Sequence, residues 1–142
     1  IFAKAIYDKK PLRIFNKGEM YRDFTYIDDV TRAMNALINH IPNPNKEFSR
    51  LCPDPSSSWA PHRILNIGNN QVVSLLDFID YMEQEIGIKA IKQFEEIQPG
   101  DVEKTFADTQ SIMDLVGFKP NTPIKKGIEK FIEWYKEYFK KK

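Results

Sequence analysis

Residues 22–30 read RDFTYIDDV, and this stretch decides the fold class. Its apolar and aromatic residues predict a strand over Arg22–Ile27. Asp28 can then cap a helix over Asp29–His40. A strand that leads directly into a helix is typical of proteins that mix the two elements. The apolar positions expected on the buried side of this helix are Val30, Met34, Leu37 and Ile38.

The same alternation of strands and helices continues on both sides of this stretch. Further strands are expected over Leu12–Phe15, Arg63–Gly68, Val72–Val73 and Ile88–Glu95. Further helices are expected over residues 1–8, over 75–86 after the cap Ser74, over 109–116 before the stop Gly117, and from Pro123 onward. Residues 41–62 hold five prolines and three consecutive serines, which predicts an irregular loop or insertion. The pattern indicates an α/β or α+β arrangement.

Composition and charge narrow the class of protein. The 142 residues are 42% hydrophobic and 29% charged, with a net charge of +1. Such a balance gives no broad field for nucleic acid or an anionic membrane, so we expect neither as a partner. The single cysteine, Cys52, forms no intrachain disulfide, and no apolar run approaches the roughly 18 residues of a membrane helix. We therefore expect a cytoplasmic protein, and the start at Ile1 in helix-like sequence leads us to expect a fragment.

Arg22 is the first candidate for a binding residue. A planar guanidinium matches two phosphate oxygens with parallel hydrogen bonds. The alternative is a local salt bridge from Arg22 to Asp28 or Asp29, and the run alone leaves both open. The two adjacent aspartates could also be paired catalytic carboxylates, but capping explains Asp28 better because neighbouring residues rarely converge on one substrate atom.

A second candidate is the turn Gln98–Asp101, where a carboxylate on a tight turn could accept hydrogen bonds from a ribose diol. Such residues more often only make the turn. His40 and His62 have no third ligand at a suitable spacing, so no metal site is expected. Tyr138 and Lys142 match a Tyr-x-x-x-Lys spacing by chance, and no glycine-rich phosphate loop is present. We therefore expect no catalytic, cofactor-binding or metal-binding residue in this chain.

Four blocks of sequence carry a resemblance to a known family. They are KPLRIFNKG at 10–18, RDFTYIDDV at 22–30, PHRILNIGN at 61–69 and QPGDVEKTFADT at 98–109. In this order they resemble the C-terminal, substrate-binding portion of the extended short-chain dehydrogenase/reductase epimerases. The UDP-glucuronate 4-epimerase group is the most similar. The resemblance spans residues 1–142 as one UDP-sugar-binding portion. It implies a mixed α/β fold with small sheets and flanking helices, and it implies that most of the Rossmann core lies upstream.

The resemblance also implies roles for five residues. Arg22 matches the arginine that contacts the diphosphate of the UDP-sugar, and Asp101 matches the aspartate that accepts from the uridine ribose. Arg13 and Phe15 match a strand whose backbone faces the uracil ring. Gln98 stands where the related UDP-galactose epimerases have a second arginine, which leaves Arg22 as the main charged contact.

For the complete protein, the resemblance implies an NAD-dependent isomerase of cell-surface polysaccharide precursor synthesis. NAD, bound mainly by the upstream part, would transiently oxidise C4 of the sugar. The protein would be a homodimer, and this chain alone would be inactive. Two alternatives stay open: a portion of a nucleotide-sugar 4,6-dehydratase or decarboxylase, and a non-catalytic nucleotide-binding module.

Overall fold

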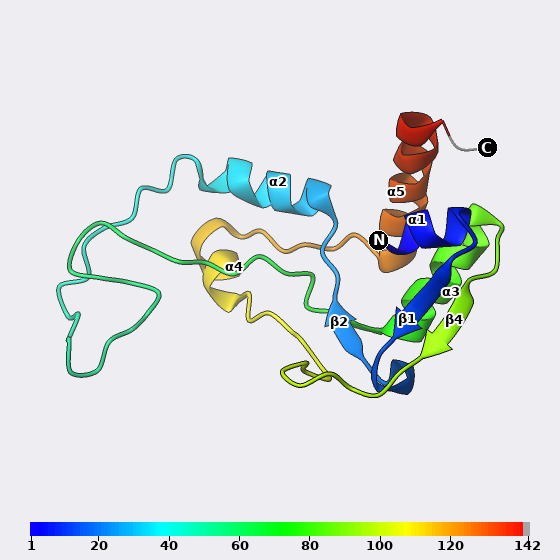
Figure 1. Cartoon of the computed structure of the whole chain (residues 1–142). Coiled ribbons are helices and arrows are strands. Elements are labelled where there is room, and N and C mark those ends of the chain that lie inside the picture. Colours follow the sequence, from blue (N-terminus) through cyan, green and yellow to red (C-terminus); the bar gives the residue numbers. More distant parts are fainter. Residues whose placement is uncertain (141–142) are drawn as a thin grey trace. The chain divides into compact units, whose positions relative to one another are not determined.

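The computed structural model describes residues 1–140, which divide into two compact units (Figure 1). The first unit contains Ile1–Phe24, Gln71–Phe106 and the segment from Thr122. The second contains Thr25–Asn70 and Ala107–Asn121. The predicted mixture of small sheets and flanking helices is confirmed.

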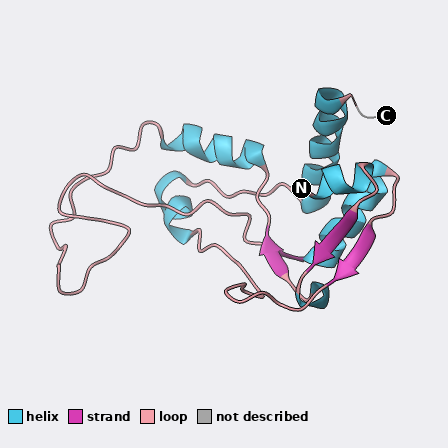
Figure 2. Cartoon of the chain, in the orientation of Figure 1, coloured by secondary structure: helices cyan, strands magenta, loops and turns pink. Residues whose placement is uncertain are grey.

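Two small sheets belong to the first unit. Strand β1 (Pro11–Ile14) pairs in parallel with β4 (Ile91–Phe94), and β2 (Tyr21–Asp23) pairs antiparallel with β3 (Val72–Ser74). Figure 2 shows these strands among the helices of the chain. The helices of this unit are α1 (Phe2–Tyr7), the short 3-10 turn η1 (Asn16–Gly18), α3 (Leu75–Ile86) and α5 (Ile124–Phe139).

Helix α3 begins and ends where its sequence predicts. The Ser74 hydroxyl accepts a hydrogen bond from the backbone N–H of Asp77 at 3.1 Å, which satisfies one of the donors that the first helical turn leaves open. Gly87 ends the helix in the left-handed conformation, at φ +78°. A glycine adopts this conformation without the steric cost of a Cβ atom.

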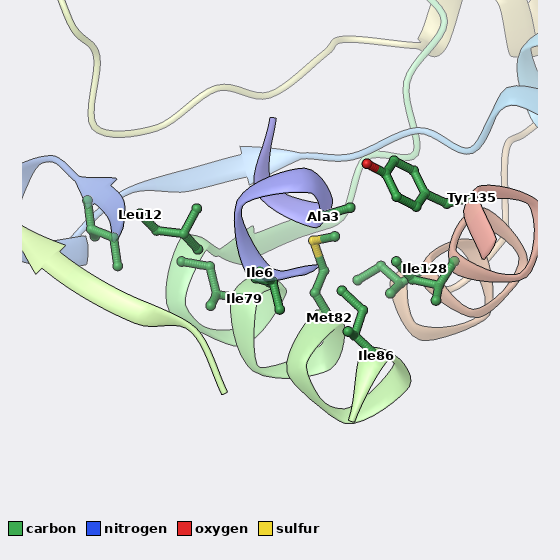
Figure 3. Close-up of a cluster of buried hydrophobic side chains, with 10 residues drawn as sticks. Ala3, Ile6, Leu12, Ile79, Met82, Ile86, Ile128 and Tyr135 are labelled. Atoms are coloured by element: carbon green, nitrogen blue, oxygen red, sulfur yellow. The ribbon is translucent and has the colours of Figure 1, made fainter. Parts of the chain in front are cut away.

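A single hydrophobic core holds the first unit together (Figure 3). Helices α1, α3 and α5 and strand β1 supply it, and Ile6, Ile79 and Ile132 are at most 2% exposed. Burying a side chain of this size contributes about 1.5–3 kcal/mol each. The other buried members are Ala3, Leu12, Ile14, Met82, Ile86, Ile128 and Tyr135.

The second unit consists largely of loop. It contains α2 (Ile27–Leu37) and α4 (Gln110–Val116), which ends at Gly117 as predicted. The segment 41–62 is irregular, also as predicted, and Figure 2 shows it as part of a long loop. It has its own hydrogen bonds, because the Asp54 carboxylate accepts from the hydroxyls of Ser56 and Ser57 at 2.8 and 2.9 Å.

The prediction for helix α2 was wrong in its cap and in its buried side. Tyr26 is the N-cap residue, and Asp28 lies in the first turn, where a negative charge still favours the helix dipole. Asp29 and Ala33 are fully buried, whereas Met34 and Ile38 are 59% and 72% exposed. The most buried positions of α2 are therefore 29 and 33, and the predicted positions 34 and 38 lie on its exposed side.

The strand predicted over Arg63–Gly68 is absent, and Ile64 is 55% exposed. A strand requires a neighbour to receive its backbone hydrogen bonds. The described residues of the second unit contain no other strand, and Ile64 instead donates its N–H to the carbonyl of Ser56 at 2.9 Å. An isolated bridge between Ser57 and Arg63 is all that forms there.

Candidate functional site

Arg22 is held beside the segment that follows the Gln98–Asp101 turn. The N–H of Tyr21 donates to the carbonyl of Glu103 at 2.7 Å, and that of Thr105 donates to the carbonyl of Tyr21 at 3.2 Å. The Arg22 Nη1 donates to the same two carbonyls, at 2.8 Å to Tyr21 and 3.2 Å to Glu103. The Arg22 side chain is thus fixed against the residues that follow Asp101, the predicted ribose contact.

The Asp29 carboxylate is bound by residues of the second unit. It forms an ion pair with Arg32 and accepts a hydrogen bond from the N–H of Asn121 at 3.3 Å. A salt bridge from Arg22 to this residue is therefore not needed to satisfy it. Since Asp28 is exposed while Asp29 is fully buried, the two do not form a pair of carboxylates facing one substrate.

Gln98, Pro99, Gly100 and Asp101 form a four-residue turn, as predicted. The N–H of Asp101 donates to the carbonyl of Gln98 at 3.1 Å, and Gly100 has φ +90°. Proline at the second position and a glycine with positive φ at the third are typical of a type II turn. Gln98 and Asp101 are both exposed, so the turn leaves their side chains open to a ligand.

Arg13 is engaged by a residue that the sequence analysis did not identify. Its Nε and Nη2 donate to the two carboxylate oxygens of Glu95, each at 2.7 Å. Its guanidinium carbon also lies 5.0 Å from the centre of the Phe15 ring, within the range of a cation–π contact. The bidentate contact raises the pKa of Arg13 and lowers the pKa of Glu95. No local signal could reveal the pair, because 82 residues separate its members.

One edge of strand β1 has no partner among the described strands. The Ile14 carbonyl accepts from the N–H of Glu95 at 2.8 Å, so the backbone of Ile14 faces β4. Successive residues of a strand direct their backbone groups to opposite edges, so the backbone of Arg13 faces away from β4. Among the described strands, only β4 pairs with β1. This edge can therefore offer an N–H and a C=O to a planar ligand.

The second unit contains a cavity of about 680 Å³. Its walls include His40, His62 and Arg63, and none of the five predicted site residues lines it. Within the described residues, no group of three or more His, Cys, Asp or Glu could hold a metal ion. The five residues of the candidate nucleotide site all belong to the first unit.

Gly18, Gly87 and Gly117 do not form the turn that binds the phosphates of a dinucleotide cofactor. A pyrophosphate is bound by backbone N–H groups where a glycine-rich turn precedes a helix. Gly87 and Gly117 instead follow helices and end them, and Gly18 is packed against the side chain of Leu76. The chance Tyr138/Lys142 spacing ends at Lys142, which lies outside the described residues.

Comparison with known proteins shows similarity along nearly the whole chain. The model of the NAD dependent epimerase/dehydratase family matches residues 1–49. Protein CapI of Staphylococcus aureus is 44% identical over 99% of this chain and 42% of its own length. A probable UDP-glucuronate 4-epimerase of Rhizobium meliloti is 38% identical, with 99% and 41% covered.

A solved structure gives the same result for the fold. The UDP-glucuronic acid 4-epimerase from Bacillus cereus, in complex with UDP-glucuronic acid and NAD, matches with a TM-score of 0.73 and 29% identity. The match covers 96% of this chain and 38% of that one. The resemblance to nucleotide-sugar epimerases is confirmed, and the chain spans about two fifths of the length of the curated relatives it matches. Among the described helices, none is long and apolar enough to cross a membrane.

Proposed function

We propose that this chain, similar along nearly its whole length to UDP-glucuronate 4-epimerases, is the UDP-sugar-binding portion of an NAD-dependent nucleotide-sugar epimerase. The whole protein would interconvert a UDP-sugar and its C4 epimer, with UDP-glucuronate as the substrate. The similarity to Protein CapI supports a role in making capsular or other cell-surface polysaccharide precursors.

The contact between Arg22 and the Glu103 carbonyl is the observation that carries this proposal. It fixes the guanidinium through Nη1 and leaves the edge formed by Nε and Nη2 directed elsewhere. That edge has the spacing of two phosphate oxygens. Asp101 lies two residues before Glu103, so the proposed ribose contact belongs to the segment on which Arg22 is held.

The other predicted residues complete a nucleotide site in this proposal. Asp101 accepts from the ribose diol, since a carboxylate offers acceptors and no donor. Gln98 replaces the second arginine found in UDP-galactose epimerases and leaves Arg22 as the charged phosphate contact. The open backbone edge at Arg13 suits the alternating carbonyl and N–H groups of a uracil ring, with Phe15 beside it.

In this proposal the present chain positions the substrate and does not carry out the reaction. Contacts to the remote UDP group hold the sugar in place for a reaction carried out by other residues. NAD supplies the redox chemistry in the whole protein, and we assign its binding mainly to residues outside this chain. We accordingly assign no catalytic residue to this chain.

The alternatives from the sequence share much of this site. A 4,6-dehydratase or decarboxylase would bind its nucleotide in a similar way, and the similarity to UDP-glucuronate 4-epimerases favours the epimerase. A non-catalytic nucleotide-binding module would bind UDP and belong to no active protein. The homodimer and the cytoplasmic location stay predictions.

Two measurements on the 142-residue chain test the proposal. Isothermal titration calorimetry should detect binding of UDP, with Arg50→Ala, an exposed loop substitution, binding equally well. An assay with NAD⁺ and UDP-glucuronate should detect no UDP-galacturonate. A wild-type chain that binds no UDP, or one that turns over the substrate unaided, would contradict the proposed role.

A further inference from the structure

We propose that Glu95 is a positioning residue for the nucleotide base. This inference rests on the proposed function and deepens it, since it assigns a role to a residue that has no place in the predicted site. Glu95 touches no part of the ligand in this proposal. It acts through Arg13 and Phe15, which form the base end of the site.

Glu95 holds both sides of the chain reversal that follows β1. Its N–H donates to the carbonyl of Ile14 at 2.8 Å, and its carbonyl accepts from the N–H of Lys17 at 3.3 Å. Its carboxylate holds Arg13 with two hydrogen bonds of 2.7 Å. Glu95 thus holds the chain both before Phe15, at Arg13 and Ile14, and after it, at Lys17. The direction of the backbone at Phe15 is therefore fixed on both sides.

The backbone directly after Phe15 is strained, which indicates that its course is imposed by its surroundings. Asn16 and Lys17 have φ values of +49° and +51°. Asparagine adopts this left-handed region readily, whereas lysine adopts it only at a cost in energy. The Asn16 side chain donates to the carbonyl of Glu19 at 3.0 Å, and the N–H of Glu19 returns to the Asn16 carbonyl at 2.8 Å. Together with Glu95, these bonds hold Lys17 in a conformation that a lysine does not favour by itself.

The carboxylate also decides what the Arg13 guanidinium can do. A free arginine beside a nucleotide site would compete for the diphosphate. Glu95 occupies the Nε and Nη2 edge of Arg13, the same edge that Arg22 keeps open for phosphate. Arg13 is thereby held against the Phe15 ring at 5.0 Å. The pair keeps the base end of the site flat and close to neutral, which suits an uncharged pyrimidine.

Glu95→Gln tests this role because it removes the charge and one acceptor while the backbone contacts stay. The probes are UDP and inorganic pyrophosphate, each titrated into the 142-residue chain by NMR, which also reads weak binding. We expect about fivefold weaker binding of UDP, the scale of one modest interaction. Pyrophosphate lacks a base, so its affinity should stay unchanged. The Phe15 ring signals should shift in the absence of any ligand.

Matched variants separate positioning from stability. Glu96→Gln removes the neighbouring carboxylate, which lies 3.7 Å from Lys17, and should alter neither UDP affinity nor the Phe15 signals. Glu95→Asp keeps the negative charge beside Arg13 and should lose less UDP affinity than Glu95→Gln. The melting temperature of Glu95→Gln should stay close to that of the wild type, because Arg13 is largely exposed.

The outcomes are distinct for the two proposals. If the wild type and Glu95→Gln bind UDP with equal affinity, the positioning role of Glu95 is overturned and the proposed function stands. Equal weakening of UDP and pyrophosphate, or a loss in Glu95→Asp as large as that in Glu95→Gln, would overturn it as well. A wild-type chain that binds no UDP would overturn the proposed function and this inference with it.

Discussion

The Nη1 nitrogen of Arg22 lies 3.2 Å from the carbonyl oxygen of Glu103, 81 residues further along the chain. This contact joins β2 to the segment that begins with the Gln98–Asp101 turn. The backbone pairing of Tyr21 with Glu103 and Thr105 runs beside it, so the junction is not made by one side chain alone. The site therefore depends on a long-range contact that neither motif specifies by itself.

Arg22→Ala should weaken UDP binding by about 1.5–3 kcal/mol, the scale of a charge-assisted hydrogen bond. Arg22→Lys should restore only part of the loss, since an ammonium lacks the planar fork. Calorimetry with UDP measures both, and Arg50→Ala is the exposed arginine control. Unchanged affinity in the alanine variant would mean that Arg22 only joins β2 to the Glu103 segment.

Asp101→Asn should weaken UDP binding by about 1–2 kcal/mol, because one acceptor for the ribose diol becomes a donor. A 2′,3′-dideoxy analogue of UDP has no diol and should bind wild type and variant alike. The comparison is made by calorimetry with the two ligands. Equal weakening for both ligands would assign Asp101 to the folding of the turn instead.

Glu83 should make the first unit dependent on pH. Burial raises the pKa of this carboxyl, but hydrogen bonds from Lys89, the N–H of Ala90 and Lys92 outweigh burial, and the pKa is lowered. A lowered pKa means that the stabilisation is complete above the ordinary value of 4.5 and is lost as the pH falls through the folded-state value. Glu83→Gln should cost about 1–3 kcal/mol at pH 7 and progressively less in acid.

Urea denaturation of both proteins between pH 7 and acid measures this effect. Glu85→Gln, an exposed substitution on the same helix, should cost far less at every pH. A constant difference between wild type and Glu83→Gln across the range would show that the charge of Glu83 contributes nothing.

Gly18→Ala should destabilise the chain by about 1 kcal/mol or more beyond Gly87→Ala, since overpacking adds to a shared backbone cost. Both glycines have positive φ, at +87° and +78°. A Cβ at Gly18 would lie 2.8–3.0 Å from Leu76, whereas one at Gly87 would meet nothing within 4 Å. Thermal unfolding compares them, and adding Leu76→Ala to Gly18→Ala should recover part of the difference. Equal losses of stability for the two substitutions would show that the Leu76 side chain moves aside without a measurable energetic cost.

Helix limits could be predicted from the sequence where capping is local. Ser74 and Gly87 bound α3 through contacts within one turn, and Gly117 ends α4 in the same way. The cap and buried face of α2 could not be predicted, because the phase of that helix follows from the burial of Asp29 against Asn121, 92 residues away. Local preference is a weak guide wherever burial decides.

The sequence by itself determined the mixed fold class, the Gln98–Asp101 turn and the resemblance to nucleotide-sugar epimerases, because each depends on residue types at short spacing. Only the tertiary structure decided that Arg22 is fixed on Glu103, that Glu95 holds Arg13, and that 63–68 forms no strand. The physical reason is common to all three. An ion pair, a carbonyl contact and a strand each need a partner that the chain supplies, or does not supply, from a distant position.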